Sequence, residues 1–529
     1  MVSGRLHKLK RISFAVLACV LLTALPSQAL DIPDEQISKP GPPVSGVGGY
    51  SGAYYDDQST LFRAFTYVEA WSEGSFTNAK ITLCKSALIE PCKSSNRVFF
   101  ETPLSPCSDS RSKDCINDFA LRIGEADWLK GNLVSTLSAD WGDIARYNTP
   151  FKGDPKRGIP DSGQASIWTF EGISHQGGTE FLVIPKLNVL FQNREGSRPS
   201  NLDVGVFAVS KSTKANECFF RTLQACYVRW PLPIDSSFRI GIQTQSKLVG
   251  WFHGRVSEPV ISSSKISDGQ TSVSIQGKSI TVPTVAVWAK NTDLPANLEK
   301  MIEDEFQSRG KRPAGSTYFG GDAKDRSKLA TIDDRNPAFD DAFFKRYLLW
   351  LKIAEDKAYT NVSTWSFRSM EDSGEYAQCI GNKGVAGMVT TNSNAYIAGP
   401  PKFNGSDLVY KVGSPHYTSK GEVQIGTYDL AIRSDVARCI YGFSSAPIQA
   451  KLSVIYADGE TQNATTVIAE KDNWLRLSAK GFTYSSPTVK VKLTQKKNQT
   501  YSINCVKGSK TKKVTGTSPK CPSGFRKAA

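Results

Sequence analysis

The chain has 529 residues and a formal charge of +15, which is distributed unevenly. The segment from Lys480 to Ala529 carries twelve Lys or Arg residues and neither Asp nor Glu, and residues 1–29 carry four more cations, so the region between them is close to neutral. A chain of this length is too long for one hydrophobic core and predicts about two to four domains. The positive charge therefore belongs to the two ends, where it indicates attachment rather than the activity of the body.

Residues 1–29 have the three parts of a secretory signal peptide. A basic start precedes a mostly apolar stretch at residues 12–25, and Ser27-Gln28-Ala29 supplies small residues for cleavage after Ala29. An alternative lipoprotein box at Val16–Cys19 would leave a very short apolar core. No later stretch reaches the roughly 18 apolar residues that span a bilayer. We therefore expect a secreted, extracellular protein without a transmembrane span, and the basic tail favours its retention at the cell surface.

Ten cysteines remain after export, which makes disulfides the default. Three pairs follow the spacing Cys-x7-Cys, one pair lies near the C-terminus, and one long-range pair remains. Closing a loop of about nine residues is worth up to roughly 2.5 kcal/mol in the chain-entropy model, which suits the pinning of surface hairpins. The spacing lacks the Cys-x2-Cys pairs of zinc sites, so we predict no metal and no cofactor. The predicted disulfides are Cys84–Cys92, Cys107–Cys115, Cys218–Cys226, Cys379–Cys439 and Cys505–Cys521.

The pattern predicts a mainly β, multidomain protein that begins with a Pro- and Gly-rich linker at residues 30–46. In the region 47–290, short alternating segments are separated by Gly, Pro, Ser and Asn. Some 240 residues of this kind fit one large β-sandwich or two smaller ones. The clearest predicted strands are 65–71, 181–184, 204–209, 238–242 and 282–288.

Residues 291–386 change to helical periodicity and are predicted to bridge the β regions. Apolar residues recur at helical spacing from Leu298 to Phe306 and again from Phe339 to Ala354. Asn336 and Pro337 are expected at the N-cap and first-turn positions of the second helix. Such stripes usually pack against a core, so we assign both helices a structural role.

Strands return at residues 387–495, which have the size and rhythm of an immunoglobulin-like β-sandwich. The full immunoglobulin signature is absent, because Trp474 follows Cys439 instead of lying between two sandwich cysteines. In the last strand, 488–493, Val and Leu alternate with Lys490 and Lys492, which predicts a buried face and an outward cationic face. The other predicted strands are 422–432, 438–441, 450–456, 465–469 and 474–479.

No catalytic signature is present: the chain lacks a Gly-x-Ser-x-Gly elbow, a His-Glu-x-x-His motif, a phosphate-binding loop and an EF-type calcium loop. The segment Gly250–Arg255 gathers an indole, an imidazole and a guanidinium between two glycines. Trp251, His253 and Arg255 are therefore candidates for binding a sugar or an anion. The interpretation that we favour is a strand whose His and Arg satisfy buried carbonyl groups. Ten tryptophans also allow a sugar-stacking platform, although most are expected in the core.

The alternative function is a secreted hydrolase that acts on carbohydrate or peptide. Such an enzyme needs His253 or His175 beside a carboxylate or serine in a cleft. The surroundings of His175 and His416 are instead typical of structural turns. No residue is therefore predicted to be catalytic.

Residues 496–529 form a basic tail with a predicted disulfide hairpin. It contains Cys505-Val506-Lys507-Gly508, then Lys512-Lys513-Val514-Thr515, then Pro519-Lys520-Cys521-Pro522 followed by Ser523-Gly524. This tail resembles a C-terminal module of many secreted, uncharacterised actinobacterial proteins. The resemblance covers about 30 residues, and the end here is shorter in lysine than is usual in the module. It implies an origin and a location but no mechanism.

A cationic strand face and a Lys-rich hairpin suit an anionic polymer of the cell envelope, such as an acidic polysaccharide. Nucleic acid is disfavoured by export and by the lack of interleaved aromatic residues. A solubilising end with no partner is the structural alternative. The lysines predicted to contact the polymer are Lys490, Lys492, Lys496, Lys497, Lys507, Lys510, Lys512 and Lys513.

Overall fold

The structure, a computed structural model, has about 55% of its residues in strands and 12% in helices, which confirms the mainly β class. The signal peptide region and the tail residues Lys496 and Lys497 lie outside the part of the chain that it describes. The described ranges are 32–44, 47–56, 65–71, 81–109, 112–138, 150–192, 196–197, 200–213, 218–222, 224–248, 250–267, 270–308, 317–322, 324–335, 338–370, 376–380, 384–443, 448–455, 461–462, 465–484, 488–495, 501–516 and 519–528.

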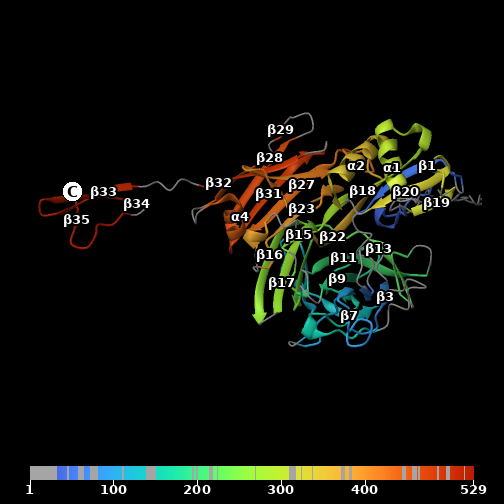
Figure 1. Cartoon of the computed structure of the whole chain (residues 1–529), viewed down its shortest axis with the longest axis horizontal. Helices are drawn as coiled ribbons and strands as arrows, with labels where there is room; N and C mark the ends of the chain where they lie inside the picture. Colours follow the sequence, from blue (N-terminus) through green and yellow to red (C-terminus); the bar gives the residue numbers. More distant parts are fainter. Residues whose placement is uncertain are drawn as a thin grey trace, which may run out of the picture.

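The first sandwich packs a five-stranded antiparallel sheet against part of a larger sheet (Figure 1). Phe119 and Phe238 of the five-stranded sheet stack with ring centroids 6.1 Å apart. Phe181 and Trp365 of the larger sheet contact Phe238 at 5.9 and 6.0 Å. Because successive residues of a strand face opposite sides, the residues between these aromatics form an outer face. In spatial order the strands are β16 (Ser257–Ser267), β17 (Gln270–Lys278), β14 (Ser236–Thr244), β5 (Cys115–Ile123) and β6 (Leu129–Lys130).

The larger sheet is built around two long strands, β9 (Glu180–Gln192) and β11 (Asn201–Ser212), which pair antiparallel. The other edge of β9 pairs with β8 and β4, and the other edge of β11 pairs with β13 and β22. The remaining strands of this part are β2 (Tyr67–Trp71), β3 (Ile81–Leu83), β4 (Arg97–Pro103), β7 (Asn132–Leu137), β8 (Ala165–Thr169), β10 (Gly196–Ser197), β12 (Phe220–Arg221) and β13 (Cys226–Trp230).

Strand β22 (Thr360–Met370), which lies within the predicted helical bridge, joins the parts of the molecule. Its first half pairs with β18 (Ile280–Lys290), and its second half lies between β11 and β15 (Trp251–Arg255). β15 pairs in parallel with β23 (Gly387–Thr391) on its other edge. The hydrogen-bonded sheet therefore includes strands from all three predicted regions, 47–290, 291–386 and 387–495.

The second sandwich buries alternate apolar residues from two facing sheets, among them Leu430 and Leu477 from one and Val489 and Val491 from the other. The predicted buried face of strand 488–493 is thus confirmed. One sheet contains β23, β27 (Ile425–Arg433), β31 (Trp474–Thr483) and β30 (Thr465–Lys471). The other contains β24 (Ala395–Ile397), β26 (Asp407–Gly413), β32 (Thr488–Gln495), β28 (Ile448–Ile455) and β29 (Thr461–Gln462), with β21 (Ala338–Phe339) beside β24 and β25 (Lys402–Phe403) beside β26.

The strand predicted at residues 438–441 is wrong, because these residues end the helix α4 (Ser434–Tyr441). A run of four residues is too short to separate a helical from an alternating pattern. The helix buries Val436 and Ala437, and its Cys439 is disulfide-bonded to Cys379 of α3 (Ala377–Ile380).

Helices α1 (Ala296–Ser308) and α2 (Asp341–Ile353) confirm the two predicted helices. They cover β18 and β1, with Tyr347 and Trp350 fully buried. The predicted N-cap at Asn336 is wrong: Asp340 caps α2 and accepts from the backbone N–H groups of Ala342 and Phe343 at 2.9 and 2.8 Å. The strands beneath are β1 (Tyr50–Tyr55), β20 (Leu329–Arg335) and β19 (Thr317–Gly321), beside β18.

The segment that follows the predicted cleavage site docks on the edge of β22. In η1 (Asp34–Gln36), the Asp34 carboxylate accepts from the backbone N–H of Asn361 at 2.6 Å, and the Glu35 carboxylate accepts from that of Ser363 at 2.8 Å. These two N–H groups point away from β18. They lie on the edge of β22 that pairs with β11 only at residues 365–367. The two acids thus occupy donors that would otherwise form an open strand edge.

We expect the double variant Asp34→Ala, Glu35→Ala to lose about 2–4 kcal/mol of unfolding free energy, because each hydrogen bond to a charged acceptor contributes about 1.5–3 kcal/mol before solvent exposure weakens it. Urea denaturation measures the loss, and hydrogen exchange should accelerate at the amides of Asn361 and Ser363. The pair Asp34→Asn, Glu35→Gln keeps a carbonyl acceptor at each position and should lose less than half as much. Equal losses in the two double variants would contradict this role.

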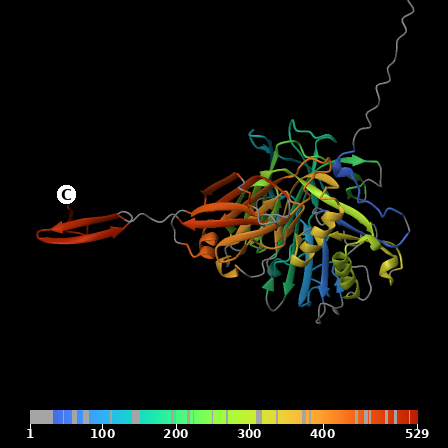
Figure 2. The same cartoon turned by 90° about the horizontal axis from the view of Figure 1, so that it is seen from above.

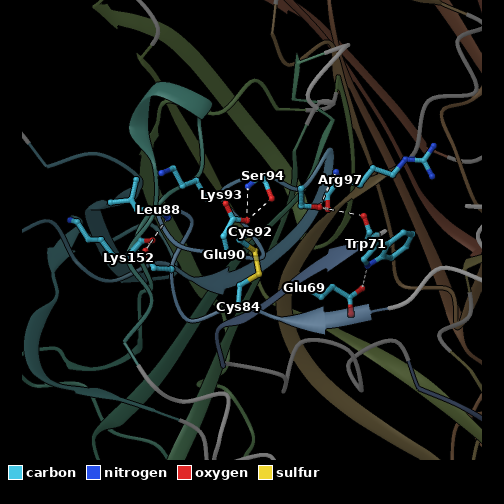
Figure 3. The surroundings of a disulfide bond; sticks show 12 residues. Glu69, Trp71, Cys84, Leu88, Glu90, Cys92, Lys93, Ser94, Arg97 and Lys152 are labelled. Atoms are coloured by element: carbon cyan, nitrogen blue, oxygen red, sulfur yellow. Dashed lines mark hydrogen bonds between the residues drawn. A yellow bond between two sulfur atoms is a disulfide. The ribbon is translucent and has the colours of Figure 1, made fainter. Parts of the chain in front are cut away.

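Five disulfides are present, in the pairing that the spacing predicted. Figure 3 shows Cys84–Cys92, which closes a loop next to β2 and β4. Within the loop, the Glu90 carboxylate accepts from the backbone N–H and the hydroxyl of Ser94. Cys92 is completely buried, so this disulfide fixes the loop against the core that contains Val98 and Phe100.

The C-terminal sheet lies apart from the sandwiches in both overall views (Figures 1 and 2). Its strands are β33 (Tyr501–Lys507), β34 (Lys510–Gly516) and β35 (Arg526–Lys527), in the order β34-β33-β35, and among the described strands they pair with one another and with no other strand. The Cys505–Cys521 disulfide joins β33 to the segment before β35. In the described ranges, no helix has both the length and the hydrophobicity needed to cross a bilayer.

Candidate functional site

Strand β15 carries the Trp251, His253 and Arg255 motif and separates the two sandwich cores. Phe252 faces the first core, whereas Trp251 faces the second. Trp251, His253 and Arg255 are each at most 1% exposed. No ligand can reach them from solvent in this conformation, so the structure gives the predicted ligand-binding role no support.

The glycines of this region are needed for close packing rather than for binding. A Cβ on Gly254 would lie 2.2 Å from Cε of Met388, and a Cβ on Gly387 would lie 2.2 Å from the ring of Trp251. Both distances are far below contact distance, so the absence of a side chain at these positions leaves room for the side chains of Met388 and Trp251.

Arg255 cross-links the turn that follows β23. Its Nη1 donates to the carbonyl oxygens of Thr391 and Ser393 at 2.9 and 2.5 Å, and its Nη2 donates to that of Asn394 at 2.8 Å. The Asn394 amide in turn donates to the carbonyls of Tyr55 in β1 and Pro283 in β18 at 3.0 and 2.9 Å. Arg255 therefore ties β15 to the sheet beneath the helices, as the favoured interpretation of buried carbonyl groups requires.

His253 does not share that role. Its ring stacks on Tyr396 with centroids 3.4 Å apart and planes 10° from parallel, and neither ring nitrogen has a hydrogen-bond partner. Burial lowers the pKa of His253 well below its usual value, and the positive charges of Arg255 and Arg368 lower it further. The imidazole is therefore neutral in the folded protein, and the favoured interpretation is wrong for this residue.

We expect His253 to make the protein sensitive to acid. Below about pH 6.5 the unfolded chain binds a proton at this residue and the folded chain does not, so stability falls by about 1.4 kcal/mol per pH unit as the pH decreases. His253→Phe keeps the aromatic stack and removes the proton uptake. The difference in unfolding free energy between the variant and the natural chain should therefore grow between pH 6.5 and 5 in urea denaturation.

The acids whose burial raises their pKa, namely Asp114, Asp356 and Asp429, act in the opposite direction. They are present in both proteins, so their contribution cancels in the difference. A constant difference across this pH range would contradict the prediction.

The other two described histidines hold turns. Nε2 of His175 lies 3.0 Å from the carbonyl oxygen of Glu180, and Nδ1 accepts from the N–H of Gly177 at 3.1 Å. Nδ1 of His416 lies 2.8 Å from the carbonyl oxygen of Tyr484. Both nitrogens of His175 are thus engaged by the backbone, and this arrangement does not supply the base that the hydrolase alternative requires.

The C-terminal sheet brings together four cations. In an antiparallel pair, directly opposite residues point to the same face. Lys512 and Lys527 are both in register with Cys505, and Lys507 is in register with Lys510. All four lysines therefore share one face with the disulfide, and all are exposed. We call Lys507, Lys510, Lys512 and Lys527 the lysine face.

The remaining predicted lysines are placed elsewhere. Lys513 is in register with Asn504 and lies on the opposite face of the C-terminal sheet. Lys490 and Lys492 point outward from β32, as predicted, but Asp407 of β26 is in register with Lys492 and lowers the local charge. The tail contains no acid, and the four lysines of the lysine face form no ion pair with a described residue. The lysine face thus carries four positive charges that no described acidic residue compensates.

Lys527 was not among the predicted contacts, since only strand register places it beside Lys512.

Among the described residues, no three His, Cys, Asp or Glu side chains are grouped to hold a metal ion. No known protein family matches the chain, and no curated protein matches it either.

Proposed function

We propose that the chain is a secreted, disulfide-bonded β protein of the cell surface that binds an anionic envelope polymer through its lysine face. Its sandwiches, including an immunoglobulin-like one at residues 387–495, would then do binding or structural work at that surface. The observation that carries the proposal is the set of four exposed lysines on one face of a sheet that has no acidic residue.

Three further features support this function. The signal-peptide pattern and the five disulfides suit an oxidising compartment outside the cytoplasm. The tail resembles the module of secreted actinobacterial proteins. A Lys near an anionic surface contributes about 1 kcal/mol to the free energy of binding. Because exposed charges are screened beyond about 8 Å at physiological salt, the attachment should be sensitive to salt.

The test compares the full chain with a chain that ends at Gln495, each produced in an exporting cell. The full chain should sediment with the cell envelope and should be released by about 1 M salt, where the Debye length falls to about 3 Å. The truncated chain should appear in the medium. Since β33–β35 pair only with one another, the truncation leaves the sandwiches intact. Equal partitioning of the two chains would overturn the proposal, and release by nuclease would identify nucleic acid as the partner instead.

A further inference from the structure

The outer face of the five-stranded sheet carries a tryptophan that belongs to no core. Trp128 lies between β5 and β6 and is half-buried. The guanidinium groups of Arg122 in β5 and Arg239 in β14 lie over its ring, 5.0 and 4.9 Å from the centroid. Leu121 and Phe238 point into the core, so their neighbours Arg122 and Arg239 point outward. Two cation–π contacts thus fix the indole on the solvent side of the sheet.

The indole keeps free binding capacity in this position. Its N–H makes no hydrogen bond with the part of the chain that the structure describes, and Trp128 is absent from the cluster of residues that forms the first core. On the same outer face, Ser237 is 1% exposed, and its hydroxyl has no hydrogen-bond partner among the described residues, as is also true of Nε of Arg122. Strand register places Ser237 directly between Arg122 and Lys278. Unsatisfied polar atoms beside a half-buried aromatic ring are typical of a site that a polar ligand or its water completes.

Each of the three cations of this face lies near an acidic residue. Arg239 is paired with Asp118 at 2.6 Å, and this pair is well formed. Arg122 lies 3.9 Å from Glu125, whose side chain is 81% exposed, and Lys278 lies 3.9 Å from Glu125 and 3.5 Å from Glu258. Such an exposed ion pair contributes little to stability, so another anion can readily replace the Glu125 carboxylate.

We propose that this Trp128 face, defined by Arg122, Trp128, Arg239, Gln276 and Lys278, binds an acidic polysaccharide. A sugar ring would stack on the indole, and its carboxylate would replace Glu125 beside Arg122 and Lys278. Gln276 is in register with Arg239 and offers an amide to sugar hydroxyls. The choice of an acidic polymer rests on the proposed function, whereas the existence of the site rests on the geometry of the face alone.

Calorimetric titration of the full chain tests this site with three probes: an oligogalacturonate of about six residues, the neutral maltohexaose and inorganic polyphosphate. Trp128→Ala should weaken oligogalacturonate binding about thirtyfold or more, the size typical of a tryptophan at the centre of an interface. Trp128→Phe keeps an aromatic ring and should retain most of the affinity. Thermal melting of both variants verifies that the fold is intact.

Three results would overturn the Trp128 face. One is unchanged oligogalacturonate affinity in a folded Trp128→Ala protein. Another is equal binding of maltohexaose and oligogalacturonate, which would make charge irrelevant. The third is an equal loss of polyphosphate and oligogalacturonate binding in Trp128→Ala, which would reduce the site to an anion site.

The same titrations separate this inference from the proposed function. A variant with the lysine face neutralised should lose polyphosphate binding and keep the short oligogalacturonate on the Trp128 face. If Trp128→Ala has no effect while the neutralised tail loses envelope attachment, only the inference fails. If the tail variant attaches normally and Trp128→Ala does not, the proposed role of the tail fails and the site remains.

Discussion

Arg255→Met is expected to lower the free energy of unfolding by about 3–5 kcal/mol. The guanidinium donates hydrogen bonds to three backbone carbonyl oxygens, and Arg255 is at most 1% exposed. Methionine fills a similar volume but donates nothing, and each buried carbonyl left without a donor costs about 1–3 kcal/mol. Part of this cost is offset because the charge no longer has to be buried. Urea denaturation at pH 7.5 measures the change.

Two matched variants make this result specific. Arg255→Lys keeps the charge but cannot reach all three carbonyls from one ammonium group, so we expect a smaller loss than for Met. Arg433→Met removes a guanidinium that is 24% exposed and pairs with the nearby Asp435, and it should cost less than about 1 kcal/mol. A loss of under 1 kcal/mol in Arg255→Met would show that the turn after β23 does not depend on this residue.

Arg255→Met should also change the response to pH. Removing one of the two positive charges near His253 raises the pKa of that imidazole toward its usual value, although burial still holds it down. The loss of stability between pH 6.5 and 5 should therefore be no steeper in Arg255→Met than in the natural chain.

The sequence predicted strands well where apolar residues alternate and failed where the buried residues are polar. β32 was found because Val489, Val491 and Leu493 alternate with lysines. β22 was missed because its buried positions include Thr360, Thr364 and Ser366, which have no hydrophobic signal. Its hydroxyl groups are satisfied by distant segments, as when the Ser363 hydroxyl accepts from the N–H of Leu232 at 2.8 Å. Such partners are fixed by tertiary structure, which local patterns do not contain.

For the candidate sites as well, the sequence indicated which residues to consider but not how the fold arranges them. Composition located the cationic tail and the disulfide that holds it, but only strand register separates Lys513 from Lys512 and adds Lys527 to the lysine face. Similarly, the grouping of Trp251, His253 and Arg255 was visible in the sequence, whereas their burial follows from the packing of β15 between two cores. Trp128 had no distinguishing neighbours in the sequence, because Arg239 is far from it along the chain.

Replacing Lys507, Lys510, Lys512 and Lys527 by Gln is expected to weaken attachment to an anionic surface by about 4 kcal/mol, or roughly a thousandfold, at low salt. Each Lys near such a surface contributes about 1 kcal/mol, and the four side chains act together because they share one face. The natural chain should lose affinity steeply as salt rises, and the variant should show a much flatter dependence. Co-sedimentation with vesicles of anionic lipid at increasing salt measures both quantities.

The position of the charges, not only their number, is what this experiment tests. A control that neutralises Lys513, Lys520 and Arg526 removes three charges from the same small sheet, but two of them, Lys513 and Arg526, lie on the face opposite the lysine face. We expect this control to weaken attachment by less than about tenfold, because the opposite face is turned away from a surface that the lysine face contacts. Equal losses in the two variants would mean that the tail acts as a diffuse cationic end, and the lysine face would then have no specific role. A loss in the lysine-face variant that exceeds the loss in the control by clearly more than the roughly 1 kcal/mol of its one additional charge would instead support a sheet that presents its charge in one direction.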